Sequence, residues 1–494
     1  MPPSRSRKRT SAPPATTARA RRCRRPAAVP LDDVAGAVAP PFSSPLWASL
    51  SDDLVCEIAW RVLSGDILDY VRFRAVCTRW RSGTVCPRGR GVADPRFHPR
   101  RWMMLPEGHG LYPGHSRLRG YVRFFNLDTG TFVRVKLPLF NSHCALDSVD
   151  GLLLLQRDED TGIRLVHPFT GDIAELPPLA TLLAQLKNDP SVPHGSDPYW
   201  WWSLIRYCVC ATVSCSAGAI TVMLVFHHLR RVAFATSEDR QWAMPSWEIP
   251  VNIAPLSLQG KLYLVQFPCA NGSLVFQMEV GSPPLPPKMI ATCPADKLYG
   301  GYHLVECNSQ ILLAGYTDSS MSHILIYKLE DLILERFVPV TSIGDRALFL
   351  EDRSLSVSSK ALPTIIAETV VYTCPLNRCF AQYRLTTGAW SQPFDGYSDG
   401  FNPGPYSLIQ HVISCCIRNV WYVSGPTLCV LAPSPVVRNW SLDHLIYWAI
   451  LLVILFRNKG LVYSEKETKK PGWLCWKVKR KLRIWPASHN SLCP

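Results

Sequence analysis

The sequence lacks the short signatures of the common cofactor-dependent and metal-dependent enzymes. It contains no glycine-rich phosphate loop, no His-Glu-x-x-His pair and no dinucleotide-binding fingerprint. Its histidines, which include His98, His109, His115 and the pair at 227–228, have no acidic or cysteine partners at recurring metal-ligand spacing. We therefore predict no cofactor and no metal site, and we interpret these histidines as ordinary polar or core residues.

A serine-hydrolase pattern, Gly-x-Ser-x-Gly, occurs at 396–400 with Ser398 at its centre. In hydrolases with this pattern the serine lies between a strand and a helix, and a neighbouring amide completes the oxyanion hole. The following seven residues, FNPGPYS, contain two prolines, which disfavour such a helix. We therefore predict no catalytic residue and do not expect the chain to be an enzyme.

Acidic residues are absent from the first 25 positions, which carry nine lysines and arginines of a chain whose net charge is +15. We predict a disordered basic tail over 1–44. Its clusters at 5–9 and 19–25 have the spacing of a bipartite nuclear-import signal, while an organelle transit peptide and an inert solvated tail are the alternatives. No secretory hydrophobic segment lies near Met1, so we expect the nucleus or the cytoplasm.

The 18 cysteines do not form the paired Cys-x-x-Cys sets of a structural zinc site. The pairs Cys208 and Cys210, Cys374 and Cys379, and Cys415 and Cys416 have other spacings. In a reducing compartment, we expect most cysteines to be small buried residues in strands.

Long hydrophobic runs are few. The run at 204–226 contains Arg206 and a Ser-Ala-Gly break, which predict two buried strands and a turn. The run at 445–456 has twelve apolar residues, which is short for a bilayer span. A membrane tail anchor is possible there, and a buried strand or an atypical terminus is the favoured alternative, within a divergent C-terminal tail over 436–494.

Helical features are concentrated at 45–90. Ser51 is suited to cap a helix that begins with Asp52 and Asp53, and Ser64-Gly65 supplies its end. Asp66 can cap a second helix. Apolar residues recur at helical spacing in the first helix, at Leu54, Val55, Ile58, Ala59 and Val62.

The stretch YVRFRAVCTRWRS at 70–82 mixes arginines with aromatic residues, which suggests a nucleic-acid surface. On one continuous helix, however, Phe73, Val76, Cys77 and Trp80 would form an apolar stripe with Arg72, Arg74, Arg79 and Arg81 outside it. Base stacking needs exposed aromatic rings among the cations, so we consider nucleic-acid binding the weaker interpretation.

From about Arg101 onward, short apolar runs alternate with turn residues, which is typical of an all-β domain. Three segments, at 124–135, 164–176 and 381–393, each place Thr-Gly between two strand-like runs, and we expect positive φ at Gly130, Gly171 and Gly388. A degraded fourth copy lies at 325–337. Their separations of 41 and 217 residues fit a repeat of about 43 residues and about seven propeller blades, with a two-sheet sandwich pair as the alternative.

The trio at 200–202, three consecutive tryptophans, is the most conspicuous aromatic cluster. Exposed at a propeller mouth, these rings would be suitable binding anchors. Core packing is the favoured interpretation, because aromatic side chains bury large areas.

The segment 50–81 resembles an F-box, whose pattern is Leu-Pro-x-x-Leu, a second apolar turn and Val-Cys-x-x-Trp. The matching residues are Leu50, Leu54, Ile58, Leu63, Ile67, Val76, Cys77 and Trp80. Ser51 stands where the family usually has proline, so the loop that enters the first helix is less rigid.

The segments at 94–110, 148–158 and 400–411 resemble a large plant F-box family whose C-terminal region is called domain of unknown function 295, or the KIB-type β-propeller domain. The resemblance covers about 46–422 and ends before Trp440. It implies an α+β multidomain chain, with a small helical F-box at 45–90 followed by a mainly-β, propeller-like domain at 101–435.

The resemblance also implies a function. Such a protein is the substrate-recognition adaptor of an SCF-type (cullin-RING) ubiquitin ligase, whose F-box docks on a Skp-type linker while the propeller binds a protein target. Partner contact or its support is then expected at Leu50, Leu54, Ile58, Leu63, Val76, Cys77 and Trp80. The alternatives are a nuclear protein that binds other proteins or nucleic acid, and a propeller enzyme.

Overall fold

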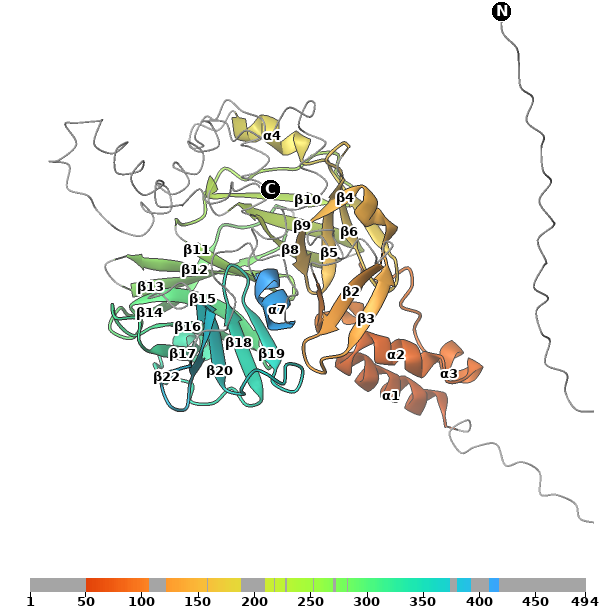
Figure 1. Ribbon diagram of the computed structural model, residues 1–494. Coiled ribbons are helices and arrows are strands. Elements are labelled where there is room, and N and C mark those ends of the chain that lie inside the picture. The colour runs from red at the N-terminus through yellow and green to blue at the C-terminus, as the bar shows by residue number, and fades with distance from the viewer. Residues whose placement is uncertain are drawn as a thin grey trace, which may run out of the picture. The chain divides into compact units, whose positions relative to one another are not determined.

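The computed structural model describes residues 50–105, 121–187, 209–391 and 408–416, apart from short gaps at 158, 217, 227–228, 252, 270–271, 282 and 374–379. The chain divides into two compact units, Met1–Ser51 and Asp52–Pro494. The elements of the second unit are labelled in Figure 1.

Three helices begin this unit, α1 (Asp52–Gly65), α2 (Ile67–Arg74) and α3 (Thr78–Ser82). We call them together the helical unit. The predicted ends are confirmed, since α1 starts directly after Ser51 and stops at Gly65. Asp66 caps α2, because its side chain accepts hydrogen bonds from the backbone N–H groups of Leu68 and Asp69.

Most strands lie in six sheets within the described residues, numbered here in chain order. Sheet 1 consists of β1 (Trp102–Met104), β2 (Tyr121–Asn126) and β3 (Phe132–Lys136). Sheet 2 consists of β4 (His143–Val149), β5 (Leu152–Arg157), β6 (Ile163–Val166) and β7 (Ile173–Leu176). Sheet 3 consists of β8 (Val209–Ser216), β9 (Ala219–Phe226) and β10 (Arg231–Thr236). Neighbouring strands in these three sheets are antiparallel.

Sheets 4 to 6 continue the series. Sheet 4 consists of β11 (Ile253–Leu258), β12 (Lys261–Cys269), β13 (Gly272–Glu279) and β14 (Lys288–Cys293). Sheet 5 consists of β15 (Gly300–Cys307), β16 (Gln310–Tyr316) and β17 (Ile324–Lys328). Sheet 6 consists of β18 (Arg346–Leu350), β19 (Leu355–Ser358), β20 (Thr369–Thr373), β21 (Phe380–Arg384) and β22 (Ala389–Trp390). Sheet 6 has the order β19-β18-β20-β21-β22, and its β18 and β20 are parallel. Helices α4 (Ala180–Lys187), α6 (Leu329–Ile333) and α7 (Leu408–Cys416) accompany the sheets.

The hydrophobic core lies between successive sheets. Separate clusters of buried residues join sheet 2 to 3, 3 to 4, 4 to 5, and 5 to 6. A further cluster, which includes Phe124, Leu153 and Phe349, joins sheet 1 to both sheet 2 and sheet 6. The six sheets of the described residues therefore follow one another in a closed ring, which is the arrangement of a β-propeller rather than of stacked sandwiches.

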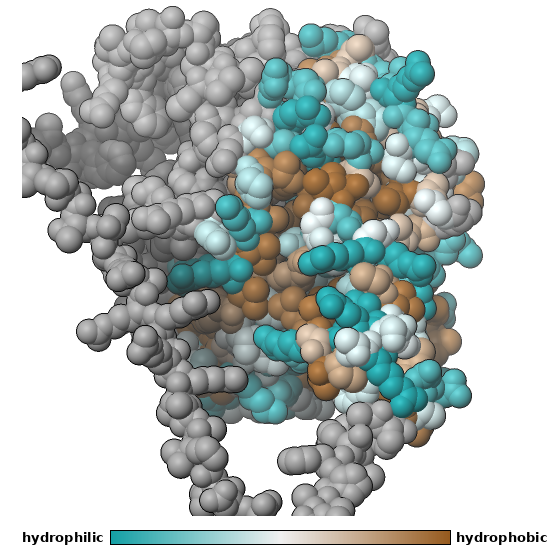
Figure 2. Space-filling model, turned by 90° about the vertical axis from the view of Figure 1, so that its right-hand side faces the viewer, coloured by the Kyte–Doolittle hydropathy of each residue, from teal (hydrophilic) through white to brown (hydrophobic). Residues whose placement is uncertain are grey.

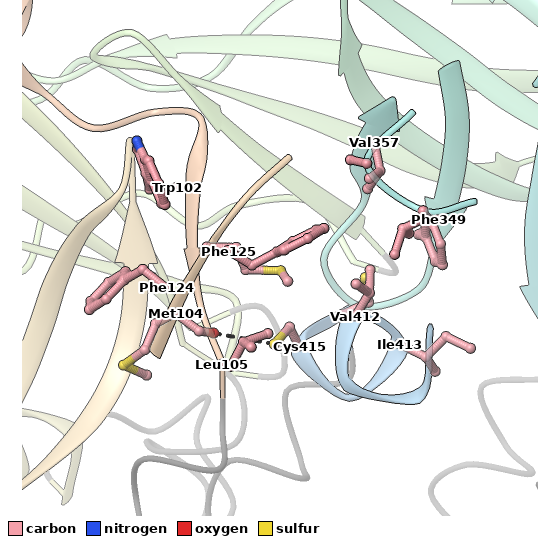
Figure 3. Packing of buried hydrophobic residues seen from close by; sticks show 14 of the residues in the cluster. Trp102, Met104, Leu105, Phe124, Phe125, Phe349, Val357, Val412, Ile413 and Cys415 are labelled. Atoms are coloured by element: carbon pink, nitrogen blue, oxygen red, sulfur yellow. Dashed lines mark hydrogen bonds between the residues drawn. The ribbon is translucent and has the colours of Figure 1, made fainter. Parts of the chain in front are cut away.

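Helix α7 belongs to the cluster that closes this ring (Figure 3). Its Val412 and Ile413 are buried between the strands that carry Met104 and Phe125 and those that carry Phe349 and Val357. The Cys415 thiol donates a hydrogen bond to the Met104 carbonyl, with 3.3 Å between the two heavy atoms. A short apolar helix thus joins the two ends of the ring.

The three Thr-Gly hairpins are confirmed as β2–β3, β6–β7 and β21–β22. Gly130, Gly171 and Gly388 have φ angles of 73°, 76° and 66°. In each turn the glycine N–H donates to the carbonyl four residues earlier, that of Asn126, His167 or Arg384. The sequence similarity of these segments therefore reflects one repeated turn.

The prediction of a fourth copy at 325–337 is wrong. Strand β17 is followed by α6 instead of a tight turn, and the chain returns only at Pro339, which forms an isolated bridge with Tyr327. Leu329 and Leu332 of this helix are buried in the cluster between sheets 4 and 5, so packing has replaced the glycine turn.

Two other expectations can be compared with the fold. Strands β8 and β9 pair as a hairpin within the predicted segment 204–226, as the Ser-Ala-Gly break indicated. The described residues form six sheets, one fewer than the repeat arithmetic gave.

In the part of the chain that the structure describes, no helix has the length and apolar character needed to cross a membrane.

Candidate functional site

The residues expected to contact a partner fall into two groups in the helical unit. Leu63 and Trp80 are buried, with 7% and 9% of their surface exposed. Leu54, Ile58 and Val76 are 52%, 37% and 61% exposed. The first pair supports the fold, and the second group is available for contact.

Cys77 belongs to neither group, because it is the N-cap of α3 and its Sγ accepts a hydrogen bond from the Trp80 N–H at 3.4 Å. Leu50 is half-buried and precedes Ser51 in the other compact unit.

The single helix implied for 70–82 is not formed. Helix α2 ends at Arg74, and Cys77 has an extended backbone with φ −154° and ψ 168° before α3 begins. The break turns Val76 to the surface and separates it from the predicted stripe. Cys77 thus occupies the N-cap position of a new helix, and the apolar period does not continue through it.

The aromatic residues of this stretch are occupied by packing. The rings of Phe73 and Trp80 stack with centroids 4.4 Å apart and an interplanar angle of 22°. The buried Tyr70 hydroxyl donates to the Val85 carbonyl at 2.7 Å. These rings are not free for base stacking.

The arginines of the same stretch differ in exposure. Arg72, Arg79 and Arg81 are exposed, and the first two pair with Asp69 and Asp52. Arg74 is half-buried and donates to the Thr84 hydroxyl at 3.0 Å, so it supports the turn after α3 instead of flanking the stripe as predicted.

Asp66 links the helical unit to sheet 1. One carboxylate oxygen caps α2, and the other accepts hydrogen bonds from Trp102 Nε1 at 2.6 Å and Asn126 Nδ2 at 2.8 Å. The carbonyl oxygen of the Asn126 side chain accepts the N–H groups of Asp128 and Thr129 in the Thr-Gly turn. One side chain of the β2–β3 hairpin therefore both closes its own turn and binds the cap of α2.

The β6–β7 hairpin does the same for the linker between α3 and β1. The His167 Nδ1 accepts the N–H groups of Phe169 and Thr170, and its Nε2, which must carry the proton, donates to the Phe97 carbonyl at 3.0 Å. Phe97 in turn is fully buried among Ala59, Leu63 and Tyr70 in the core of the helical unit.

Asp172 completes this attachment. Its two oxygens accept the N–H groups of Gly89 at 2.8 Å and Gly91 at 2.7 Å. Burial acts to raise the pKa of this carboxyl, but the two N–H donors, the Thr170 side chain and His167 together outweigh it and hold the pKa below its usual range. Burial lowers the pKa of His167, which keeps the ring neutral.

A pocket of about 830 Å³ lies where the helical unit meets the rim of the propeller. Its helical wall is the end of α1 with Trp60 and Leu63, and the linker adds His98 and several arginines. The rim contributes the turns β2–β3, β11–β12 and β15–β16 and the start of β18. Elements that are far apart in the sequence therefore share this pocket.

Most charged side chains around the pocket are paired. Asp128 bridges Arg101 at 2.7 Å and Arg346 at 2.5 Å, and Asp150 lies 3.5 Å from Arg100. Arg96 pairs with Asp94 at 2.7 Å and lies over the Trp60 ring.

Glu306 at the end of β15 is the exception among the lining residues that the structure describes, because its half-buried carboxylate has no hydrogen bond or ion pair. Burial raises its pKa, and Asp150 adds to the shift. Arg100, Arg346 and Arg101 act in the opposite direction, but burial prevails.

Sequence reasoning missed the residues that build this junction. Asp66 was recognised as a cap but not as the partner of Trp102, and Glu306 was not singled out. The signal that could have revealed two of them lies in the hairpin repeat, where Asn126, His167 and Arg384 occupy the same position before the turn. At this position Asn126 and His167 make contacts particular to their own copies, whereas Arg384 is exposed.

The other candidates give no site in the described part of the chain. No group of three or more His, Cys, Asp and Glu residues that could hold a metal ion occurs there. The cysteines described are free, with several buried in strands and the pair Cys415 and Cys416 buried in α7. The remaining predictions lie outside the described residues: Ser398, His109, His115, Cys208, Cys374, Cys379, and the segments at 1–44, 200–202, 227–228 and 445–456.

The closed ring of sheets around these turns defines the class of the molecule as a mainly-β protein of propeller type with N-terminal helices. The model of the KIB1-4 β-propeller family matches residues 124–396, which is more than half of the 494 residues. The chain belongs to this family. The comparison with curated proteins gives no match.

Proposed function

We propose that the chain is an F-box substrate-recognition adaptor of a cullin-RING ubiquitin ligase. The helical unit docks on a Skp-type linker, and the propeller binds a protein target. Catalysis is not required of this chain, since bringing a target close to a charged ubiquitin carrier is a proximity effect. We accordingly propose a non-enzymatic, cofactor-independent role in the nucleus or the cytoplasm.

The observation that carries the proposal is the exposure of Leu54, Ile58 and Val76. These three residues occupy positions of the F-box pattern, and large apolar side chains at the surface of a small helical unit favour docking in a partner's groove. Leu54 and Ile58 are four residues apart on α1, so they lie on the same face of the helix.

Exposure by itself does not select this face. Figure 2 shows a side of the protein on which apolar and hydrophilic residues form alternating patches. Leu285, Met289 and Val338 in the propeller are also exposed. The combination of exposure with the F-box spacing is what favours the helical unit. Nucleic-acid binding has less support, because Phe73 and Trp80 stack on each other.

The test is binding to a purified Skp-type linker, measured by biolayer interferometry. We expect the double variant Leu54→Glu, Ile58→Glu to lose affinity by at least about 100-fold, because each buried apolar side chain contributes about 1.5–3 kcal/mol. A matched control is Ile333→Glu, Leu334→Glu, which changes two side chains of α6 and its end that are 47% and 59% exposed.

The control variant should bind as the wild type does. Equal binding by both variants, or no binding by a wild-type chain whose circular dichroism shows it folded, would contradict the proposal. Trp80 is unsuitable for this test, because its burial in the helical unit makes misfolding a second explanation of lost binding.

A further inference from the structure

A proline-rich loop joins β13 to β14, and its sequence at 283–288 is Pro-Pro-Leu-Pro-Pro-Lys. We call these six residues the proline loop. The chain bends at Pro283 and then continues without helix or strand to Lys288, where β14 begins. Strand β14 is the last strand of sheet 4, and Figure 1 shows it at the outer side of the propeller. The proline loop is therefore held between two paired strands on the outside of the ring.

The composition of the proline loop favours the polyproline II conformation. A proline ring fixes its own φ at about −65°, and the residue before a proline is restricted to extended backbone. Both restrictions act at 283–287, where four of the five residues are proline. A polyproline II helix has about three residues per turn, and it loses little conformational entropy when a partner binds it.

The exposure of the side chains follows this period of about three residues. Four side chains of the proline loop are exposed, those of Pro283, Leu285, Pro286 and Lys288. The other two are less accessible, since Pro284 is buried and Pro287 is half-buried. With 74% of its surface exposed, Leu285 is the most exposed large apolar side chain that the structure describes. One side of the segment therefore lies against the protein, and the other sides face the solvent.

This pattern is what an SH3-type groove requires of its ligand. Aromatic side chains of such a groove contact two sides of a Pro-x-x-Pro segment, and an acidic pocket beside them receives a lysine or arginine at Pro-x-x-Pro-x-Lys spacing. Pro283, Pro286 and Lys288 have this spacing, which occurs once in the sequence. The residues that turn away from the groove are then Pro284 and Pro287, the two that lie against the protein.

We propose that the proline loop is a docking segment for an SH3-type domain of another protein, with Lys288 in the acidic pocket of that domain. Lys288 is available for this contact, because no carboxylate of the described residues forms an ion pair with it. The inference goes beyond the proposed function, since the helical unit is hydrogen-bonded to sheets 1 and 2 and the proline loop belongs to sheet 4.

The test is binding of the full chain to two purified domains, measured by biolayer interferometry. One is an SH3 domain that selects Pro-x-x-Pro-x-Lys peptides, and the other is a WW domain that selects Pro-Pro-Leu-Pro peptides. We expect the SH3 domain to bind more tightly, because only its groove has an acidic pocket for the lysine.

Two variants of the proline loop should weaken binding to the SH3 domain by at least about tenfold each. The double variant Pro283→Ala, Pro286→Ala removes the rings that contact the groove and frees φ at both positions. Lys288→Glu places a negative charge opposite the acidic pocket. Both change exposed side chains, and circular dichroism checks that each variant is folded.

The matched controls change exposed residues of the same types outside the proline loop. They are the double variant Pro339→Ala, Pro363→Ala and the single variant Lys136→Glu, and both should bind as the wild type does. A folded wild-type chain that does not bind the SH3 domain, or that binds the WW domain more tightly, would overturn the proposal. Equal binding by a loop variant and its control would also overturn it, because the SH3 domain would then be held elsewhere, as by the basic residues at 1–44.

Discussion

The β2–β3 and β6–β7 hairpins differ from the β21–β22 hairpin in the role of the residue four positions before the turn glycine, although all three have the same turn. Asn126 and His167 close their turns with one polar atom and reach the N-terminal region with the other. Arg384 takes the equivalent position in β21–β22 and is exposed. The repeated turn forms the same hairpin in each copy. The residue four positions before the turn glycine determines whether that hairpin is hydrogen-bonded to the N-terminal region, as Asn126 and His167 are.

The largest effect is expected at Asp66, on which the first hairpin and α2 converge. Asp66→Ala should lower the free energy of unfolding by about 3 kcal/mol, because it removes a helix cap and leaves Trp102 Nε1 and Asn126 Nδ2 without their acceptor. Urea denaturation measures this change. The control Asp69→Ala removes an exposed carboxylate of α2 and should cost less than about 0.5 kcal/mol.

An Asp66→Ala protein as stable as the control would show that the helical unit does not depend on the hairpin. The conservative variant Asp66→Asn sharpens the test. It retains an acceptor for the α2 N–H groups, so it should recover the cap and only part of the contact with sheet 1.

The second hairpin is tested through the segment between α3 and β1, to which it is hydrogen-bonded. A Cβ at Gly91 would lie 2.4 Å from Thr170 Oγ1 and 2.8 Å from Asp172 Oδ2, so Gly91→Ala should destabilise the protein by about 2 kcal/mol. Gly65→Ala is the matched control, because a Cβ there meets nothing within 4 Å. Thermal unfolding compares the two, and equal melting temperatures would refute the close contact.

The first and second hairpins should also differ in their response to pH. Burial lowers the pKa of His167, so below the usual histidine pKa of about 6.5 the unfolded chain binds a proton that the folded chain resists. Stability should therefore fall by about 1 kcal/mol between pH 7.5 and 5.5. Urea denaturation across this range measures it.

The control is His167→Asn, which installs the residue of the first hairpin and should flatten this part of the profile. His303, whose pKa burial lowers to about 4, contributes with the same sign in both proteins, so the difference between the two profiles is the relevant quantity. Asp172 has a lowered pKa, and its contribution is lost only at more acidic pH, below about 3.9. Parallel profiles between pH 7.5 and 5.5 would exclude His167 as the source.

The smallest effect is expected in the third hairpin. Arg384→Ala should change the free energy of unfolding by less than about 0.5 kcal/mol, because an exposed side chain is removed and the Gly388 turn is kept by its backbone hydrogen bond. A loss of 2 kcal/mol or more in urea denaturation would mean that this position has a contact comparable to that of Asn126.

The parts of the fold that local chemistry determines could be predicted from the sequence. Thr-Gly at 129–130, 170–171 and 387–388 predicted the tight turns, and Asp66 predicted the cap of α2. The helix in place of a fourth hairpin could not be predicted, because burial of Leu329 and Leu332 of α6 depends on neighbouring strands.

The candidate site was predictable only in part for the same reason. The resemblance to an F-box singled out Leu54, Ile58 and Val76 as expected contact residues, but their exposure depends on which face of α1 packs against Phe97 and on the break at Cys77. The pocket around Glu306 joins residues from 60 to 356, a range over which periodicity carries no information.

Hydrogen exchange tests the central claim, that the residue before the turn fixes the helical unit to its blade. Asn126→Asp retains the acceptor that closes the turn and replaces the donor to Asp66 with a second carboxylate, whereas Arg384→Ala alters the same position of the third hairpin. We predict that Asn126→Asp raises exchange of the α2 amides at Leu68 and Asp69 by about tenfold or more, while Arg384→Ala leaves them unchanged. Equal exchange of these amides in both variants would contradict the account.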